Sequence, residues 1–196
     1  MNVHNQEDYV LVKDFIAGNE ACIEELIRRH KDRVYTYILL IVKNSQLAED
    51  IFQDTFIKVI KSLRRGKYQD KGKFLSWVLR IAHNLIIDHY RKQKLMRTVS
   101  NDDSDYDLLN NHKLADATIE DNLVHDQVMN DVKRLIATLP EDQRQVVYLR
   151  HYCGLSFKEI ADQTGVSINT ALGRMRYALI NMRKMIKEKN LSLTTS

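Results

Sequence analysis

A single proline and six glycines in the whole chain are the feature that most limits how it can fold. Sheets joined by tight turns need many such residues, because proline presets a turn dihedral and glycine tolerates a positive φ. A hydrophobic fraction of 44% is enough for a packed core and excludes a wholly disordered chain. With only two cysteines, a disulfide-rich framework is excluded as well. The sequence therefore predicts an all-α protein.

The two cysteines, Cys22 and Cys153, have no partner at CxxC spacing. We expect both to be reduced, buried apolar side chains, and we expect no metal site and no cofactor. Residues 1–8 lack the pattern of a signal peptide. The longest apolar run, Tyr37–Val42, is far shorter than the roughly 20 residues of a membrane helix. No membrane insertion and a cytoplasmic location are therefore expected.

Charge divides the chain into three blocks. Residues 1–97 hold 18 basic and 12 acidic groups, residues 98–122 hold one and seven, and residues 123–196 hold 11 and seven. The overall charge of +4 thus combines blocks of +6, −6 and +4. The middle block is too poor in apolar residues to bury surface that offsets its ordering entropy. The pattern predicts two small helical domains, 8–97 and 123–190, joined by a flexible acidic linker over 98–122.

One helix of the first domain is predicted from apolar residues that recur every three or four positions. They form one buried face: Ala48, Ile51, Phe52, Thr55, Phe56, Val59 and Leu63. A second face of the same helix carries Asp50, Gln53, Asp54 and Ile57. An isoleucine among acidic and amide groups indicates a docking surface. A solvated face with one stray apolar residue is the alternative, because single exposed hydrophobic residues are normal.

A further helix is predicted from residue 74 onward, with the core stripe Val78, Ile81, Ala82, Leu85 and Ile86. A neighbouring stripe carries Trp77, Arg80, Asn84 and Arg91, and a basic loop over 64–73 that includes Lys71 and Lys73 precedes it. Basic side chains bind phosphates, an aromatic ring stacks on an exposed base, and asparagine hydrogen-bonds a base edge. The combination predicts binding of a nucleic-acid strand with unpaired bases. A core tryptophan beside a solvated basic face is the alternative.

The second domain carries the signature of a helix-turn-helix. Pro140 is expected in the first turn of a helix that ends near Gly154. Ser156 and Glu159 have the spacing of a capping box, and Gly165 suits the left-handed residue of a tight turn between helices. The run Ile-Ala-x-x-x-Gly-Val-Ser is typical of helix-turn-helix proteins.

The second helix of this motif is expected to begin after its cap, Ser167. Its predicted core stripe is Ile168, Ala171, Met175, Leu179, Met182 and Ile186. Its predicted exposed positions are Asn169, Thr170, Gly173, Arg174, Arg176 and Tyr177. A capped, basic N-terminal half is what a DNA recognition helix needs, whereas a helical hairpin that binds protein is the alternative.

Three motifs, in this order, resemble a known family. The run Ala48-Glu-Asp-Ile-Phe-Gln-Asp-Thr-Phe resembles a motif that docks on the clamp helices of RNA polymerase. The run Trp77-Val-Leu-Arg-Ile-Ala-His-Asn is similar to the segment that melts and reads the −10 promoter element. Asn169-Thr-Ala-Leu-Gly-Arg, behind the helix-turn-helix signature, is similar to the segment that reads the −35 element. Over roughly 8–97 and 125–188, the chain resembles the extracytoplasmic-function sigma factors of the sigma-70 family.

This resemblance implies a role for each candidate residue. Clamp docking falls to Asp50, Gln53 and Asp54 with Ile57 alongside. Reading of the −10 element falls to Asn84, supported by Trp77 and Arg80, with the basic loop bordering a flipped base. In the recognition helix, Leu172, Gly173, Arg176 and Tyr177 would face bases, and Arg174 would contact a phosphate. Relatives often carry Lys or Arg at the position of Leu172 and Ser at that of Gly173, so DNA shape and backbone contacts are expected to contribute more to −35 recognition here.

The function implied by the resemblance is that of an alternative sigma factor without catalytic activity, acting in the bacterial cytoplasm. Its expected partners are core RNA polymerase, through the β′ clamp and the β flap, promoter DNA, and an anti-sigma factor. The free protein is expected to be a monomer. A stand-alone helix-turn-helix regulator is the alternative, but it leaves residues 8–97 without a role.

Overall fold

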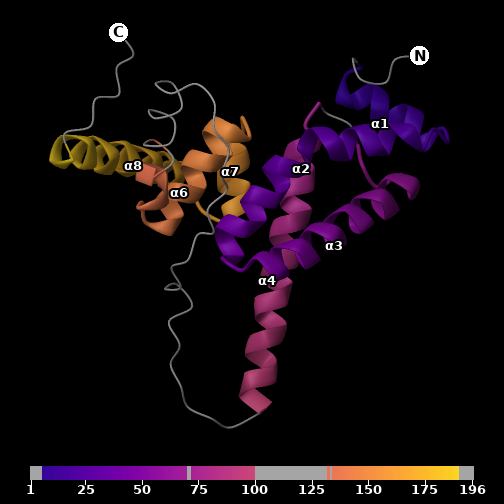
Figure 1. Ribbon diagram of the computed structural model, residues 1–196. Coiled ribbons are helices and arrows are strands. Elements are labelled where there is room, and N and C mark those ends of the chain that lie inside the picture. The colour runs from indigo at the N-terminus through magenta and orange to yellow at the C-terminus, as the bar shows by residue number, and fades with distance from the viewer. Residues whose placement is uncertain (1–5, 70–71, 100–131, 133, 190–196) are drawn as a thin grey trace. The chain divides into compact units, whose positions relative to one another are not determined.

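The computed structural model describes residues 6–69, 72–99, 132 and 134–189. Within these ranges every regular element is a helix, and the chain divides into two compact units, Met1–His112 and Lys113–Ser196 (Figure 1). The predicted all-α class is confirmed. Of the predicted linker, Thr98 and Val99 belong to the helix Phe74–Val99, and residues 100–122 lie outside the described residues.

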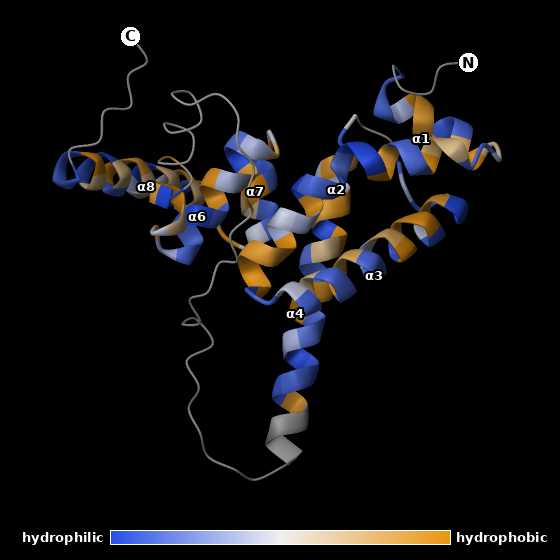
Figure 2. Ribbon diagram, viewed as in Figure 1, coloured by the Kyte–Doolittle hydropathy of each residue, from blue (hydrophilic) through white to orange (hydrophobic). Residues whose placement is uncertain are grey.

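The described part of the first unit holds the helices α1 (Asp8–Ile16), α2 (Ala21–Val42), α3 (Ser45–Arg64) and α4 (Phe74–Val99). Helices α2, α3 and α4 all pack on one another, and α1 lies on α2. Hydrophobic and hydrophilic residues alternate along α2 and α3, as helices with one buried face require (Figure 2). The apolar faces meet in a core whose largest fully buried side chains include Leu26, Tyr37, Ile38, Leu63 and Leu79.

The buried face of α3 was predicted almost completely. Six of the seven residues are buried, and Phe52 is half-buried, with its ring edge-on to those of Tyr35 and Phe56. The helix starts where the sequence provides a cap, because the side-chain oxygen of Asn44 accepts a hydrogen bond from the Leu47 amide at 2.9 Å. Burial of this face directs the opposite one, which begins at Asp50, toward solvent.

Helix α4 buries more than the predicted stripe. Val78, Ala82 and Ile86 are buried and Ile81 and Leu85 are half-buried, as the helical spacing indicates. Three further apolar residues are buried that the prediction missed: Phe74, Leu75 and Leu79. The N-terminal half of α4 contacts two neighbours, α2 and α3, so its buried face is wider than one stripe. Its C-terminal half extends beyond these helices and is mostly hydrophilic (Figures 1 and 2).

A charged cluster ties α1 to α2. The carboxylate of Asp8 accepts hydrogen bonds from Nε2 of His30 at 2.7 Å and from the Arg29 guanidinium at 3.1 Å. Arg29 also donates to buried Glu25 at 2.8 Å and to the carbonyl of Gln6 at 2.6 Å. Burial raises the pKa of Asp8, but the hydrogen bonds and charges of His30 and Arg29 outweigh burial and leave this pKa below its ordinary value. The ionised form of Asp8 therefore stabilises the fold.

Asp8→Asn is expected to lower the free energy of unfolding by about 1–3 kcal/mol at pH 7, because it removes a charged acceptor from two hydrogen bonds. Asp8 has a depressed folded pKa, so its contribution is complete above the ordinary value of 3.8 and is lost as the pH falls through the folded value. Urea unfolding from pH 7 to pH 2.5 should show that the free energies of unfolding of wild type and Asp8→Asn converge as the pH falls through the folded pKa of Asp8. Glu7→Gln, an exposed neutralisation one residue earlier, should change stability by no more than about 0.5 kcal/mol. A constant difference between wild type and Asp8→Asn at every pH would contradict the assignment.

The described part of the second unit holds α6 (Glu141–Val147), a one-turn π-helix (Tyr148–Tyr152) that continues it, α7 (Phe157–Thr164) and α8 (Ile168–Glu188). Both α6 and α7 pack against α8. Pro140 lies one position earlier than predicted: it is the N-cap of α6, with ψ at 146°, and the helix begins at Glu141. The helical segment ends at Tyr152 with Cys153 as its C-cap, close to Gly154, as predicted.

The local signals of the helix-turn-helix are confirmed. Ser156 and Glu159 form the capping box of α7, in which each side chain bonds the other's backbone amide. Gly165 ends α7 in the left-handed conformation with φ at +68°. The hydroxyl of Ser167 then accepts a hydrogen bond from the Thr170 amide at 3.0 Å, which starts α8.

The predicted core stripe of α8 was partly wrong. Ile168 and Leu179 are 46% and 41% exposed, whereas Ala178, absent from the prediction, is fully buried. The buried face is formed by Ala171, Met175 and Ala178. Ala171 and Ala178 are small, so α6 and α7 can pack closely against this face of α8. The longer apolar side chains lie on the neighbouring face, outside the core, and form an exposed apolar stripe: Ile168, Leu172 and Leu179.

Both cysteines are buried free thiols, as predicted. Burial, together with the carboxylate of Asp14, raises the pKa of Cys22 and keeps it neutral. No helix in the described ranges combines the length and the apolar character that crossing a bilayer requires.

Candidate nucleic-acid interface

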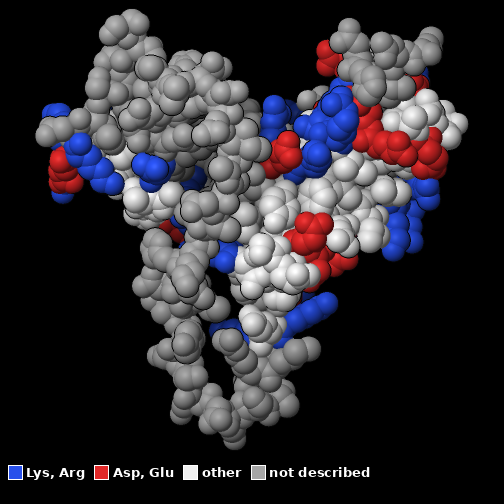
Figure 3. Space-filling model, viewed as in Figure 1, with Lys and Arg blue, Asp and Glu red and all other residues white. Residues whose placement is uncertain are grey.

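We call the first candidate region the α3 surface: Asp50, Gln53, Asp54 and Ile57. All four side chains are exposed, and Ile57 is 48% exposed although it is apolar. Gln53 donates a weak hydrogen bond to Glu49, at 3.3 Å. Acidic side chains gather over the N-terminal half of α3 and basic ones at its other end (Figure 3). The region is therefore an acidic surface with one apolar side chain at its edge.

The second candidate region, the α4 stripe, comprises Trp77, Arg80, Asn84 and Arg91. Helical spacing places them on one side of α4, where Trp77 is half-buried and the other three are exposed. Arg91 forms an exposed ion pair with Asp88 at 3.2 Å. Of the two loop lysines, Lys73 is exposed, and Lys71 lies outside the described residues. Along this side of α4, the ring of Trp77 is thus followed toward the C-terminus by the cation of Arg80, the amide of Asn84 and the cation of Arg91.

Tyr68 is a candidate that sequence reasoning missed. Its ring lies 4.4 Å from that of Trp77 and edge-on to that of buried Phe74, at 6.0 Å between centroids. The loop between α3 and α4 therefore folds back so that an aromatic pair lies at the start of the α4 stripe. Its position within a basic loop was the available signal, since basic segments that bind single strands also carry aromatic residues.

A polar contact between α2 and the inward side of α4 helps to fix the orientation of α4. The hydroxyl of Tyr37, which is fully buried, lies 2.9 Å from Nδ1 of His83. Burial lowers the pKa of His83, so the ring is neutral near pH 7 and its Nδ1 can accept a hydrogen bond from the Tyr37 hydroxyl. His83 precedes Asn84 directly, so this contact helps to hold Asn84 on the outward side.

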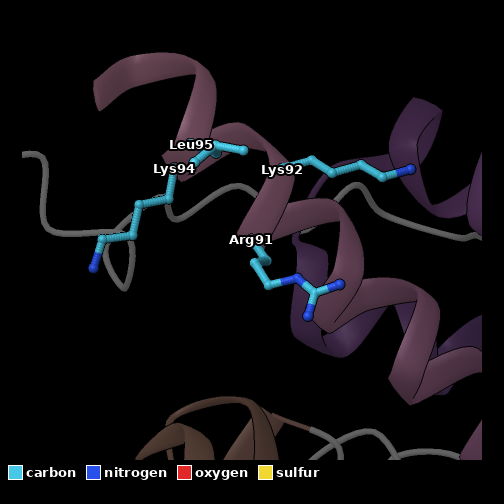
Figure 4. Close-up of a pocket in the computed structure, with 4 residues that line it drawn as sticks. All are labelled: Arg91, Lys92, Lys94 and Leu95. Atoms are coloured by element: carbon cyan, nitrogen blue, oxygen red, sulfur yellow. The ribbon is translucent and has the colours of Figure 1, made fainter. Parts of the chain in front are cut away.

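A pocket on the extended half of α4 is lined by Arg91, Lys92, Lys94 and Leu95 (Figure 4). The three basic side chains leave the helix in different directions. They are therefore poorly arranged to surround one small anion, and better suited to successive phosphates of a nucleic-acid strand.

The recognition helix of the helix-turn-helix exposes most of its candidate residues. Ser167, Asn169, Thr170, Leu172, Arg176 and Tyr177 are exposed, and Gly173 is half-buried. Leu172 and Tyr177 are 44% and 61% exposed. The first three turns of α8 thus present amide, hydroxyl, cationic and apolar groups to solvent, which are the groups that read base edges.

Arg174 differs from its neighbours on α8. Its guanidinium binds the carboxylate of Asp142 in α6 at 2.6 Å, and its side chain is only 23% exposed. Close by in the same helix pair, Asn181 donates to Gln143 at 2.8 Å. Arg174, which was expected to contact a phosphate, is thus paired with the carboxylate of Asp142 in the neighbouring helix. Sequence reasoning did not predict this partner.

Residues 26–96 match the family Sigma-70 region 2, and residues 129–176 match Sigma-70, region 4. The chain is 33% identical to the ECF RNA polymerase sigma factor SigE of Mycolicibacterium smegmatis, over 81% of this chain and 60% of that protein's length. It is 29% identical to the RNA polymerase sigma factor CarQ of Myxococcus xanthus, over 91% of this chain and 97% of the relative.

Two solved structures share the fold. CnrH, in complex with the cytosolic domain of CnrY, superposes with a TM-score of 0.58 at 20% identity, over 93% of this chain and 99% of that chain. The sigma factor RpoE of Bartonella quintana, in complex with the anti-sigma factor NepR, gives a TM-score of 0.57 at 18% identity, over 84% and 96% of the two chains.

Two helical units, the second of which carries a helix-turn-helix, define the class of a helical transcription factor. With both sigma-70 regions matched in order, the chain belongs to the extracytoplasmic-function group of the sigma-70 family. It is an alternative sigma factor, and its partners are core RNA polymerase and promoter DNA. The stand-alone regulator is not favoured, because the region 2 match accounts for the unit that such a regulator leaves unexplained.

Proposed function

We propose that the α3 surface docks on the polymerase clamp, that the α4 stripe captures the −10 element, and that the first three turns of α8 read the −35 element. The observation that carries this proposal is that α3 and α4 bury their apolar faces while the candidate residues lie outward. An acidic surface with one exposed isoleucine suits a partner that offers cations around an apolar contact. The proposed domains are 8–97, for the clamp and the −10 element, and 123–190, for the −35 element.

Capture of a base by the first unit would help to open the promoter. Unstacking a base costs a few kcal/mol, which binding of the extruded base offsets. Trp77 and Tyr68 offer an aromatic surface, Asn84 a hydrogen-bonding amide, and Arg80 and Arg91 cations for the phosphates. The protein would thereby supply promoter specificity and opening while the polymerase performs the chemistry, so we assign it no catalytic residue.

The part of the predicted linker that follows α4, residues 100–122, would connect the two recognition units. Promoter elements about two helical turns apart are separated by roughly 70 Å. These 23 residues, fully extended, span at most about 75–85 Å, which is enough to connect the two sites. The net charge of −6 in this segment suits passage through a basic channel of the polymerase.

An anti-sigma factor is the third proposed partner, since one structural neighbour, RpoE, was solved bound to an anti-sigma factor. Such a partner would compete with polymerase by covering the exposed surfaces of α3, α4 or α8. We further propose that the free protein is a monomer in the bacterial cytoplasm, where core polymerase and chromosomal DNA are found.

Run-off transcription with core RNA polymerase tests the proposal. The purified protein should bind core polymerase and direct initiation at promoters that carry paired −35 and −10 elements. A protein that binds DNA tightly without polymerase and never directs initiation would instead be a stand-alone regulator. A protein that neither binds core polymerase nor initiates anywhere would refute the sigma assignment of these surfaces.

A further inference from the structure

The outward face of the recognition helix contains an apolar position where a base-reading side chain is expected. Leu172 lies in the second turn of α8 and is 44% exposed, and exposed Asn169 and Arg176 lie one turn to either side of it. Helix-turn-helix proteins use this N-terminal half of the recognition helix to contact base edges. Leucine has no hydrogen-bond donor or acceptor, so whatever it contacts must be apolar.

Gly173, beside Leu172, is not required by the fold. It lies inside α8, its φ is not in the left-handed region, and a Cβ added there would meet no atom within 4 Å. Glycine weakens a helix relative to alanine, so α8 would be more stable with alanine at this position. What a glycine does provide is close approach of a bulky partner to the helix backbone. At Gly173 a bulky partner can therefore approach the backbone of α8 more closely than at the neighbouring positions that carry side chains.

We propose that Leu172 recognises the 5-methyl group of a thymine in the major groove of the −35 element, and that Gly173 lets α8 approach closely enough for this contact. Among the four bases, only thymine presents a methyl group on its major-groove edge. Leucine against any other edge would strip water from polar atoms and offer them no hydrogen bond in return. The inference rests on the proposed role of α8 and adds the chemical group that it reads.

The test is to remove the methyl group from the DNA. The −35 element is first selected from random sequences by the holoenzyme of full-length protein and core polymerase. Each thymine in the selected element is then replaced singly by deoxyuridine, which pairs identically but lacks the methyl. Loss of one buried methyl should weaken holoenzyme binding about 3–5-fold at one thymine. Leu172→Ala should bind more weakly and should no longer distinguish thymine from deoxyuridine there.

Leu179→Ala is the matched control, because Leu179 is 41% exposed on the same side of α8 but two turns further along. This variant should keep full sensitivity to the methyl group. Gly173→Ala should raise the thermal stability of the protein while weakening promoter binding, a combination that a purely structural glycine would not give.

The outcomes separate this inference from the proposed function. A holoenzyme that selects an upstream element but is indifferent to every thymine methyl overturns this inference alone, as does Leu172→Ala that keeps the discrimination. Gly173→Ala with unchanged promoter affinity overturns the role given to Gly173. A holoenzyme that selects no promoter overturns the proposed function, and the methyl contact with it.

Discussion

Asn84→Ala is expected to reduce promoter opening about 5–150-fold while leaving the affinity for core polymerase unchanged. An amide that hydrogen-bonds a base edge through two atoms contributes about 1–3 kcal/mol. Asn84 is exposed on α4, and the Tyr37–His83 contact beneath it does not depend on its side chain. The variant should therefore fold normally and lose only the contact to an extruded base. Permanganate reactivity of the −10 thymines measures opening, and competition for core polymerase measures docking.

Gln93→Ala provides the control for this experiment. It removes an amide of similar chemistry from the same helix, at a position that helical spacing places off the α4 stripe. It should leave both opening and core binding close to wild type. Equal loss of opening and core binding in Asn84→Ala would contradict the assigned role, since it would mean that the variant disturbs the unit as a whole.

Features that depend on neighbours within four residues could be predicted from the sequence. The capping box of Ser156 and Glu159, the left-handed Gly165 and the cap at Ser167 are all of this kind, and all three are present. The buried face of α3 was also predictable, because a helix packed against its neighbours along one side repeats its apolar residues at 3.6-residue spacing. Local chemistry was therefore enough to predict where α7 begins and ends and where α8 begins.

Features set by packing between distant segments were not predictable. In α8 the apolar residues mark two adjacent sides, and only the positions of α6 and α7 decide that Ala178 is buried while Leu179 is exposed. The ion pair of Asp142 and Arg174 joins residues 32 positions apart in different helices. Tyr68 reaches Trp77 only because a loop folds back over α4. Two of these features, the Asp142–Arg174 ion pair and the Tyr68–Trp77 contact, lie at proposed DNA surfaces. The resemblance implied roles for Arg174 and Trp77, and the structure shows which residues they contact.

Reversal of one charge on the α3 surface is expected to have the other large effect. Asp54→Lys should weaken binding to core polymerase about 30–1000-fold, because like charges brought together across an interface cost several kcal/mol, and each 1.4 kcal/mol is a factor of ten. Asp54 is exposed on the face opposite the core of α3, so the free energy of unfolding should change by no more than about 0.5 kcal/mol. Competition for core polymerase gives the affinity, and urea unfolding checks the fold.

Asp32→Lys, on an exposed position of α2, is the matched variant. It changes the net charge of the protein by the same amount, so an effect of overall charge would weaken core binding equally in both variants. The salt dependence of core binding adds a second criterion, because exposed charge pairs weaken as ionic strength rises. Asp54→Lys should reduce that dependence relative to both wild type and Asp32→Lys. Equal affinities for the two variants would mean that polymerase docks elsewhere on the first unit, and the α3 surface would lose its assigned role.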